Sequence, residues 1–162
     1  MRSQLDDNII NTLSALKGMT MQLCRYKHGD YSPNDGFVLC GASDYYFIEA
    51  RTKVIDDKYE LYLLVVTAVT EDELDEDVHF DVIWEGELSD VHVFYHVLSG
   101  IQVKGQMVPD ISSECAMMIG FDGINKLIYP GGDFVAETSI EEDTDKILDV
   151  ISDLKLQHSR TL

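Results

Sequence analysis

Lysine and arginine are absent between Lys58 and Lys104, and carboxylates occupy that stretch instead. Residues 1–70 carry nine acidic and seven basic side chains, whereas residues 71–162 carry 21 acidic and five basic ones. Binding to nucleic acids or to anionic membranes depends on clustered lysine and arginine, so this composition argues against both. Ten of the carboxylates in this gap lie between positions 71 and 90, namely Glu71, Asp72, Glu73, Asp75, Glu76, Asp77, Asp81, Glu85, Glu87 and Asp90.

Cysteine is also scarce, and long apolar runs are missing. Cys24, Cys40 and Cys115 are odd in number and share no CxxC spacing. Two of them could pair, but three thiols fit a reducing cytosol better than a disulfide scaffold. The first residues lack the apolar region of a signal peptide, and no apolar run reaches the length of a membrane span. We therefore expect a cytoplasmic protein.

Motifs for catalysis or for cofactor binding are lacking too. The glycines show no GxGxxG spacing and no serine lies in a GxSxG motif. The acidic run 71–77 lacks the glycine and the ligand order of an EF-hand loop. His92 and His96 are four residues apart, but the glutamate of a His-Glu-x-x-His site is missing. We expect no catalytic residue, no metal and no cofactor, and we expect the cysteines to be small buried residues.

Amphipathic helices are predicted near both ends of the chain. The segment 4–17 has apolar residues at helical spacing, with Ser3 as its N-cap. The segment 139–156 has a similar apolar face, and two overlapping capping boxes begin at Thr138 and Ser139. Both helices are expected to pack on one face of a sheet.

The middle of the chain is predicted to be rich in strands. The segment 59–69 is apolar on both faces, which is typical of a strand in the centre of a sheet. Asp122 and Gly123 predict a type I′ hairpin turn, and Pro130 is expected to break the strand that follows it. Residues 89–99 fit a strand or a short helix, and their caps favour the helix. The expected strands are 19–27, 37–41, 45–55, 59–69, 77–85, 101–108, 115–121 and 124–129.

The strand 77–85 carries part of the acidic gap. The apolar set is expected to face the core and the polar set to face water, with Ile83 as the exception. On that reading Asp77, Asp81 and Glu85 form an exposed row about 13 Å apart, although a plain solvated face explains them as well. The two sets are Val78, Phe80, Val82 and Trp84 on one side, and Asp77, His79, Asp81 and Glu85 on the other.

Together these features predict the fold class α+β. A single domain, residues 1–162, would contain an antiparallel sheet of about six to eight strands. The N-terminal and C-terminal helices would cover one face of that sheet. Chain length, 162 residues, and an apolar content of 45% are ordinary for one globular domain.

The preferred function is a non-enzymatic acidic protein that binds a basic protein surface. Repulsion among clustered carboxylates opposes a compact state, so a cationic partner would give a reason to keep them, as would solubility alone. Inhibitors that occupy nucleic-acid sites, antidotes of the immunity type and phage-encoded factors share this charge and size. The ten carboxylates from Glu71 to Asp90 are the predicted partner-binding residues.

Two other functions compete with this hypothesis. A small acidic dimeric chaperone or adaptor would hold an apolar client segment, with little dependence on salt. An enzyme would draw on dispersed groups, namely the three cysteines and His28, His79, His92 and His96.

Overall fold

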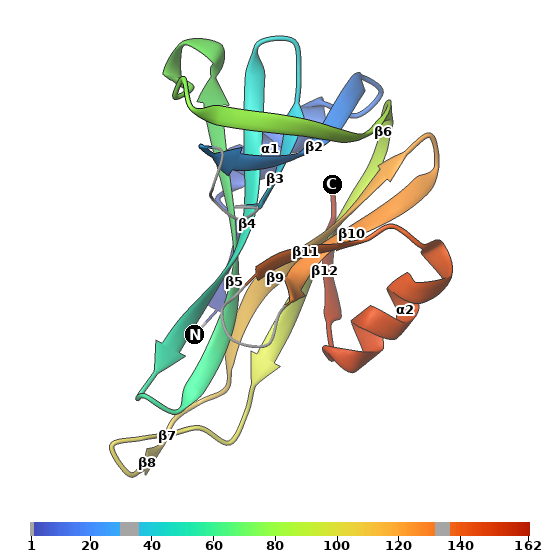
Figure 1. Ribbon diagram of the computed structural model, residues 1–162. Helices are drawn as coiled ribbons and strands as arrows, with labels where there is room; N and C mark the ends of the chain where they lie inside the picture. Colours follow the sequence, from blue (N-terminus) through green and yellow to red (C-terminus); the bar gives the residue numbers. More distant parts are fainter. Residues whose placement is uncertain (1, 30–35, 132–136) are drawn as a thin grey trace.

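The computed structural model describes residues 2–29, 36–131 and 137–162, and their fold is mostly antiparallel β-sheet (Figure 1). Two short helices, α1 (Asp7–Ala15) and α2 (Thr144–Asp153), and one 3-10 turn, η1 (Glu71–Glu73), accompany the strands. The strands are β1 (Arg2–Ser3), β2 (Thr20–His28), β3 (Gly36–Cys40), β4 (Asp44–Ile55), β5 (Tyr59–Thr70), β6 (Val78–Leu98), β7 (Gln102–Val103), β8 (Gln106–Met107), β9 (Ile111–Phe121), β10 (Ile124–Gly131), β11 (Glu137–Glu141) and β12 (Gln157–Thr161).

The predicted α+β class is wrong. One sheet of ten strands dominates the described residues, in the order β11-β10-β9-β6-β2-β3-β4-β5, with β1 paired to β9 and β12 paired to β6. Every pair in it is antiparallel except β1 with β9. The sequence pattern overestimated both helices and missed the strand character of residues that flank them.

Strand β6 organises the sheet because it belongs to both of its halves. From Val78 to Glu87 it pairs with β2, and from Leu88 to Leu98 it pairs with β9. Its register shifts opposite β2 between Leu23 and Cys24, and again opposite β9 after Leu88. Such bulges bend a strand and increase its twist. Figure 1 shows the result: β6 crosses the top of the molecule and then turns down beside β9.

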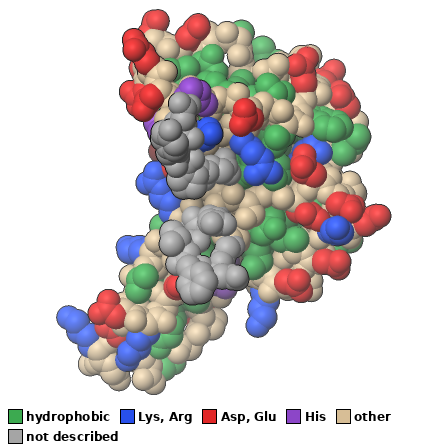
Figure 2. Space-filling model, viewed as in Figure 1, with side chains coloured by type: hydrophobic (Ala, Val, Ile, Leu, Met, Phe, Trp, Pro, Cys, Tyr) green, Lys and Arg blue, Asp and Glu red, His purple; other side chains and the backbone are tan. Residues whose placement is uncertain are grey.

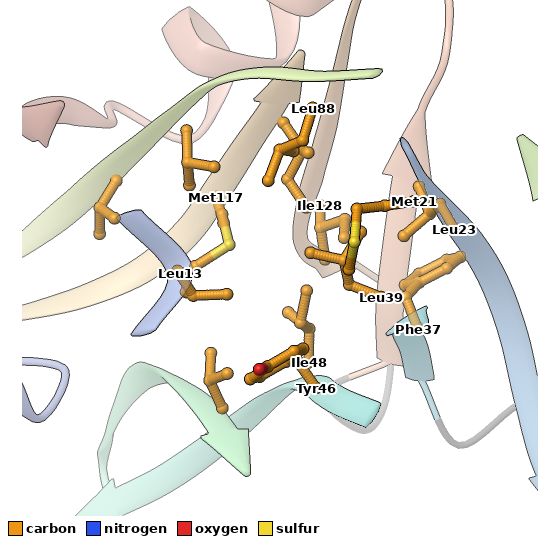
Figure 3. Packing of buried hydrophobic residues seen from close by; sticks show 14 of the residues in the cluster. Leu13, Met21, Leu23, Phe37, Leu39, Tyr46, Ile48, Leu88, Met117 and Ile128 are labelled. Carbon is orange, nitrogen blue, oxygen red and sulfur yellow. The ribbon is translucent and has the colours of Figure 1, made fainter. Parts of the chain in front are cut away.

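The main hydrophobic core lies between the two halves of the bent sheet. It joins residues of β2 to β6, β9 and β10 with the fully buried Leu13 of α1. Figure 3 shows Leu13 and Met117 pointing toward one another, with Leu88 nearby. Helix α1 therefore contributes to the interior that the sheet halves enclose.

Helix α2 packs elsewhere, so the two helices do not share one face of the sheet as predicted. Its Ile147 belongs to a separate cluster with Phe94, Cys115 and Leu127. Phe94 and Val93 are neighbours in β6 and point to opposite faces, since Val93 lies in the main core. Among the described residues, neither helix has the length and apolar character needed to cross a membrane.

Helix ends differ from the prediction for reasons of local chemistry. Helix α1 begins after Asp6, whose carboxylate accepts a hydrogen bond from the Asn8 backbone N–H at 2.7 Å, and not after Ser3. Helix α2 begins after Asp143, which caps the Asp145 N–H in the same way. The predicted capping boxes instead lie in β11, which pairs with β10. In both helices the N-cap is an aspartate and not one of the serine or threonine residues that were predicted.

Four strand predictions need correction. Residues 89–99 are mostly strand, as the second half of β6, and not a helix. Residues 101–108 form a tight hairpin of β7 and β8 in place of one strand. Strand β5 lies at the end of the strand order and not in the centre of the sheet, as was predicted for residues 59–69. Contacts with β9 and α1 explain why both of its faces are apolar. Pro130 does not break β10, because it still pairs with Thr138.

The remaining strand predictions are confirmed, the Asp122-Gly123 hairpin most clearly. Asp122 (φ 51°) and Gly123 (φ 80°) both adopt the positive φ angles of a type I′ turn, between the paired strands β9 and β10. Strands β2 to β5 begin and end within one residue of the predicted bounds. Pro33, Asn34, Asp35 and Gly36 predict a turn at 32–36, which lies mostly outside the described residues.

A buried carboxylate ties both ends of the described chain to β9. Glu114 is 2% exposed, and its Oε2 accepts hydrogen bonds from the Leu5 backbone N–H at 2.7 Å and from Arg160 Nη2 at 2.8 Å. Its Oε1 accepts one from the Ser159 hydroxyl at 2.7 Å. Three donors and one positive charge satisfy this carboxylate, which offsets the cost of burying it.

We predict that Leu13→Ala lowers the free energy of unfolding by about 2–5 kcal/mol, because it opens a cavity in the main core. Leu148→Ala is the matched control: Leu148 is also in a helix but is 73% exposed. Its effect should stay within about 0.5 kcal/mol. Urea unfolding followed by circular dichroism measures both, and equal losses would contradict the assigned core.

We also predict that Glu114→Ala costs about 3–5 kcal/mol of stability, because it strips Arg160 of its closest carboxylate and leaves the Leu5 N–H unpaired. Glu114→Gln keeps an acceptor for these donors and should cost less. The same unfolding experiment compares the two variants. Equal losses would show that the hydrogen bonds to Glu114 do not hold the ends in place.

Candidate protein-interaction surface

Six of the ten predicted partner-binding carboxylates lie in the loop from η1 to the start of β6, residues 71–77, which we call the acidic loop. Backbone hydrogen bonds fix it at both ends: the Glu71 N–H donates to Ser43 O at 3.1 Å, and the Gly29 N–H donates to Asp77 O at 2.7 Å. Near its end, the Val78 N–H donates to Asp75 O at 3.2 Å. The loop therefore holds its carboxylates on an anchored backbone.

All ten carboxylates are exposed to solvent. Within the described part of the chain, only Asp90 has a lysine or arginine within 4.0 Å, namely Lys17, whose Nζ lies 3.6 Å from its Oδ1. Asp75 lies 3.9 Å from a ring nitrogen of His28. Figure 2 shows acidic side chains gathered at the upper left, over the acidic loop, with others toward the right. The field of this surface is thus mostly uncompensated.

The regular row of Asp77, Asp81 and Glu85 does not exist. Asp81 pairs with Arg25, whereas Glu85 pairs with Gln22 and accepts a hydrogen bond from its amide at 2.7 Å. Paired residues point to the same face, and positions 22 and 25 of β2 face opposite sides. The bulge in β6 therefore places Asp81 and Glu85 on opposite faces of the sheet, because one extra residue reverses the alternation.

Trp84 is displaced from its predicted neighbours by the same bulge. Trp84 is partly buried and packs against the main core. Val78 and Phe80 belong to the cluster on the opposite face of the sheet, which we call the outer face, and Val82 is 56% exposed. The ammonium of Lys126, a residue of β10 that is 3% exposed, lies 4.1 Å from the centre of the indole ring. Trp84 is therefore a core residue as predicted, but on the opposite face from Val78 and Phe80.

A hollow of about 230 Å³ lies beside the acidic loop on the outer face of β2, β4 and β5. Tyr26 and Phe47 form an edge-to-face pair in its wall, with ring centroids 4.6 Å apart. The Tyr26 hydroxyl donates a hydrogen bond to Glu49, which also forms an ion pair with Arg51 at 2.7 Å. Glu73 and Asp75 of the acidic loop complete the polar part of the lining.

The aromatic cluster continues beyond the hollow. Tyr45 stacks on Phe80 with centroids 5.4 Å apart, and Phe47 lies 6.2 Å from Phe80. Partial burial and the negative charge of Glu71 raise the pKa of Tyr45 above its ordinary value. The phenol therefore stays neutral at physiological pH, so it adds apolar surface next to the acidic loop without adding charge.

Strand spacing keeps His92 and His96 about 13 Å apart, which is too far for both to bind one metal ion. His92 and His96 lie on the same face of β6, and His92 Nδ1 lies 2.9 Å from the Thr161 hydroxyl. Tyr62 lies beside His96, with ring centroids 5.7 Å apart. Across residues 2–29, 36–131 and 137–162, the structure contains no group of three or more His, Cys, Asp or Glu side chains suited to hold a metal ion.

Two of the three cysteines meet, which the spacing in the sequence did not indicate. Cys24 Sγ and Cys40 Sγ lie 3.6 Å apart on the neighbouring strands β2 and β3, and both are free thiols. Cys115 lies in the cluster under α2, where burial and the charge of Glu114 raise its pKa to about 12. Cys24 and Cys115 are buried as predicted, and Cys40 is partly buried.

Comparisons with known proteins add no relationship. No protein-family model matches the chain, and comparisons with curated proteins and with solved structures give no significant match. The function must therefore be inferred from the surface itself.

Several functionally relevant contacts were missed by the sequence analysis. Glu114 is the only carboxylate of β9, and that isolation was the available signal for a buried partner. The Tyr26–Glu49 contact and the Lys126–Trp84 contact join strands far apart in sequence. No local pattern could indicate those two, because they depend on how the sheet bends.

We predict a pH-dependent contribution of His96 to stability. Burial lowers its pKa, and the charge of Lys155 adds to this, while a backbone hydrogen bond to Leu154 acts in the opposite direction. A lowered histidine pKa favours the neutral ring in the folded state, so stability falls as the pH drops from about 6.5 toward the folded pKa. Urea unfolding between pH 8 and pH 5 measures this.

His96→Gln should therefore flatten the pH dependence in that interval relative to the parent protein. His79→Gln, at an exposed position of the same strand, controls for the loss of an imidazole. If the His96 variant and the parent lose stability in parallel, the partly buried ring of His96 does not carry the effect.

Proposed function

We propose that this protein is a non-enzymatic binding protein whose acidic surface engages a basic surface on another protein. The acidic loop forms the centre of that surface. Asp81, Glu85, Glu87 and Asp90 follow it along β6, with Asp81 and Glu85 on opposite faces of the sheet. A partner of the nucleic-acid-binding type would present the complementary lysines and arginines, and the bound acidic protein would occupy its site as an inhibitor or antidote. We further propose that it acts in the cytoplasm.

One observation carries the proposal: ten exposed carboxylates lie along β6 and the loop before it, with a lysine or arginine within 4.0 Å of only one of them among the described residues. Their mutual repulsion opposes the compact state and would be relieved by a cationic partner. Such a partner would also associate rapidly, because opposite fields steer encounters at low salt.

The anchoring of the acidic loop supports binding rather than solubility alone. Solvation needs only charge, whereas a binding surface gains affinity when its groups are already held in place. The backbone hydrogen bonds to Ser43 and Gly29 hold the loop against β2 and the β3–β4 turn. Phe47 and Tyr45 are partly exposed beside it and offer aromatic surface to cationic side chains.

A second candidate function rests on a different surface. An apolar groove of about 570 Å³ lies at the opposite end of the molecule, between the β4–β5 turn and the β7–β8 hairpin (Figure 1). Val54 (57% exposed) and Met107 (64% exposed) lie in or beside it, with Val103 and Val108 in its lining. This groove favours the chaperone or adaptor alternative, in which an apolar client segment is held.

We predict that removing charge from the acidic loop weakens partner capture. The test variant carries Glu71→Gln, Asp72→Asn, Glu73→Gln, Glu76→Gln and Asp77→Asn. Crosslinking pull-downs from lysate at low salt, quantified by mass spectrometry, should show the parent enriching basic proteins and the variant losing about tenfold or more of them. Raising the salt should reduce capture by the parent in the same way.

The matched control removes five exposed carboxylates elsewhere, by Asp57→Asn, Glu60→Gln, Asp145→Asn, Asp149→Asn and Asp153→Asn. Both variants carry five fewer negative charges, so only a local effect separates them. Equal capture by the two variants, or no basic protein bound to the parent, refutes the proposal. Capture of an apolar client that is insensitive to salt would favour the second candidate.

A further inference from the structure

The Cys24–Cys40 pair lies outside the acidic surface and has no role in the proposed function. Cys24 pairs with Val38 across β2 and β3, and Cys40 pairs with Gln22, so the cysteines are diagonal neighbours on the outer face. Their sulfurs are 3.6 Å apart. A disulfide bond requires about 2.05 Å, so the two sulfurs must approach one another by about 1.5 Å to bond.

The two thiols differ in chemistry, as reactive pairs commonly do. They share a hydrogen bond, and donation by Cys40 lowers the pKa of Cys24 while it raises the pKa of Cys40. Burial and the charge of Asp81 oppose the effect on Cys24 without reversing it. Because the thiolate is the nucleophile, the lowered pKa favours Cys24 as the sulfur that reacts first with an oxidant.

Access to the pair restricts the oxidant to a small molecule. Cys24 is 1% exposed, whereas Cys40 is partly exposed on the same face. A bulky disulfide could not reach Cys24, but a water-sized hydroperoxide can approach beside Cys40. Cys115 lies in a different cluster, so it cannot compete for either sulfur within the folded chain.

We propose that Cys24 and Cys40 are an oxidation site, which hydroperoxides convert reversibly to an intramolecular disulfide. With hydrogen peroxide, the Cys24 thiolate attacks one oxygen, the O–O bond breaks, and the departing hydroxide takes a proton to leave as water. Cys24 is then a sulfenic acid, which the Cys40 sulfur attacks; the S–S bond forms, the S–O bond breaks, and a second water leaves. The two thiols lose two electrons and two protons, and the peroxide is reduced.

Formation of this bond would cross-link β2 to β3 on the outer face of the sheet. The same face carries Tyr45, Phe47 and Phe80, which pack against the cysteine pair in one cluster. Oxidation would therefore fix the strand pair that supports these aromatic rings. A thiol reductant would restore the two free cysteines.

The test uses the full chain, reduced and then treated with a small excess of hydrogen peroxide. Denaturation with N-ethylmaleimide and intact mass spectrometry count the thiols that remain. The reduced protein should take up three labels, and the oxidised protein one label, at Cys115. Peptide mapping should show a Cys24–Cys40 cross-link with the loss of two hydrogen atoms, and dithiothreitol should restore three labels.

Four controls make the result specific. Cys115→Ala should still form the cross-link, whereas Cys24→Ser and Cys40→Ser should not. The chain oxidised in urea should yield mixed pairs that include Cys115, because the fold no longer selects the partner. Full labelling of Cys24 and Cys40 after peroxide treatment of the folded protein, or a cross-link to Cys115 or between chains, overturns the proposal.

Discussion

The continuity of strand β6 is the constraint on which the rest of this structure depends. A single strand of 21 residues pairs first with β2 and then with β9, so the two halves of the sheet cannot separate without breaking its ladders. The bend between Glu87 and Val91 creates the enclosed space that the main core fills. The same strand carries Asp81, Glu85, Glu87 and Asp90, so the geometry of the core also decides where these carboxylates point.

Carboxylates serve opposite purposes in this molecule, and their surroundings decide which. Glu114 is buried, and every one of its contacts with Leu5, Ser159 and Arg160 compensates its charge. The acidic loop is exposed, and only its backbone is anchored. Pairing its charge lets Glu114 stabilise the fold, whereas the exposed carboxylates of the acidic loop remain able to attract a partner.

Sequence patterns over a few neighbouring residues predicted the elements that depend on local interactions. The Asp122-Gly123 turn and strands β2 to β5 followed from turn chemistry and alternation. The direction in which each side chain of β6 points could not be predicted in this way. It depends on the bulge near Ile83, which forms where β6 pairs with β2, more than fifty residues away in the chain. That one bulge removed the predicted row of Asp77, Asp81 and Glu85, while the exposure of the ten carboxylates needed no such information.

The cation over the indole of Trp84 has a practical consequence. Trp84 is the single tryptophan of the chain and sits in the half of β6 that pairs with β2, while Lys126 belongs to β10 on the other half of the sheet. A positive charge near the ring alters the energy of its excited state, so the emission spectrum of this one fluorophore reports on the junction directly. The fluorescence of Trp84 can therefore show whether the two halves of the sheet are assembled.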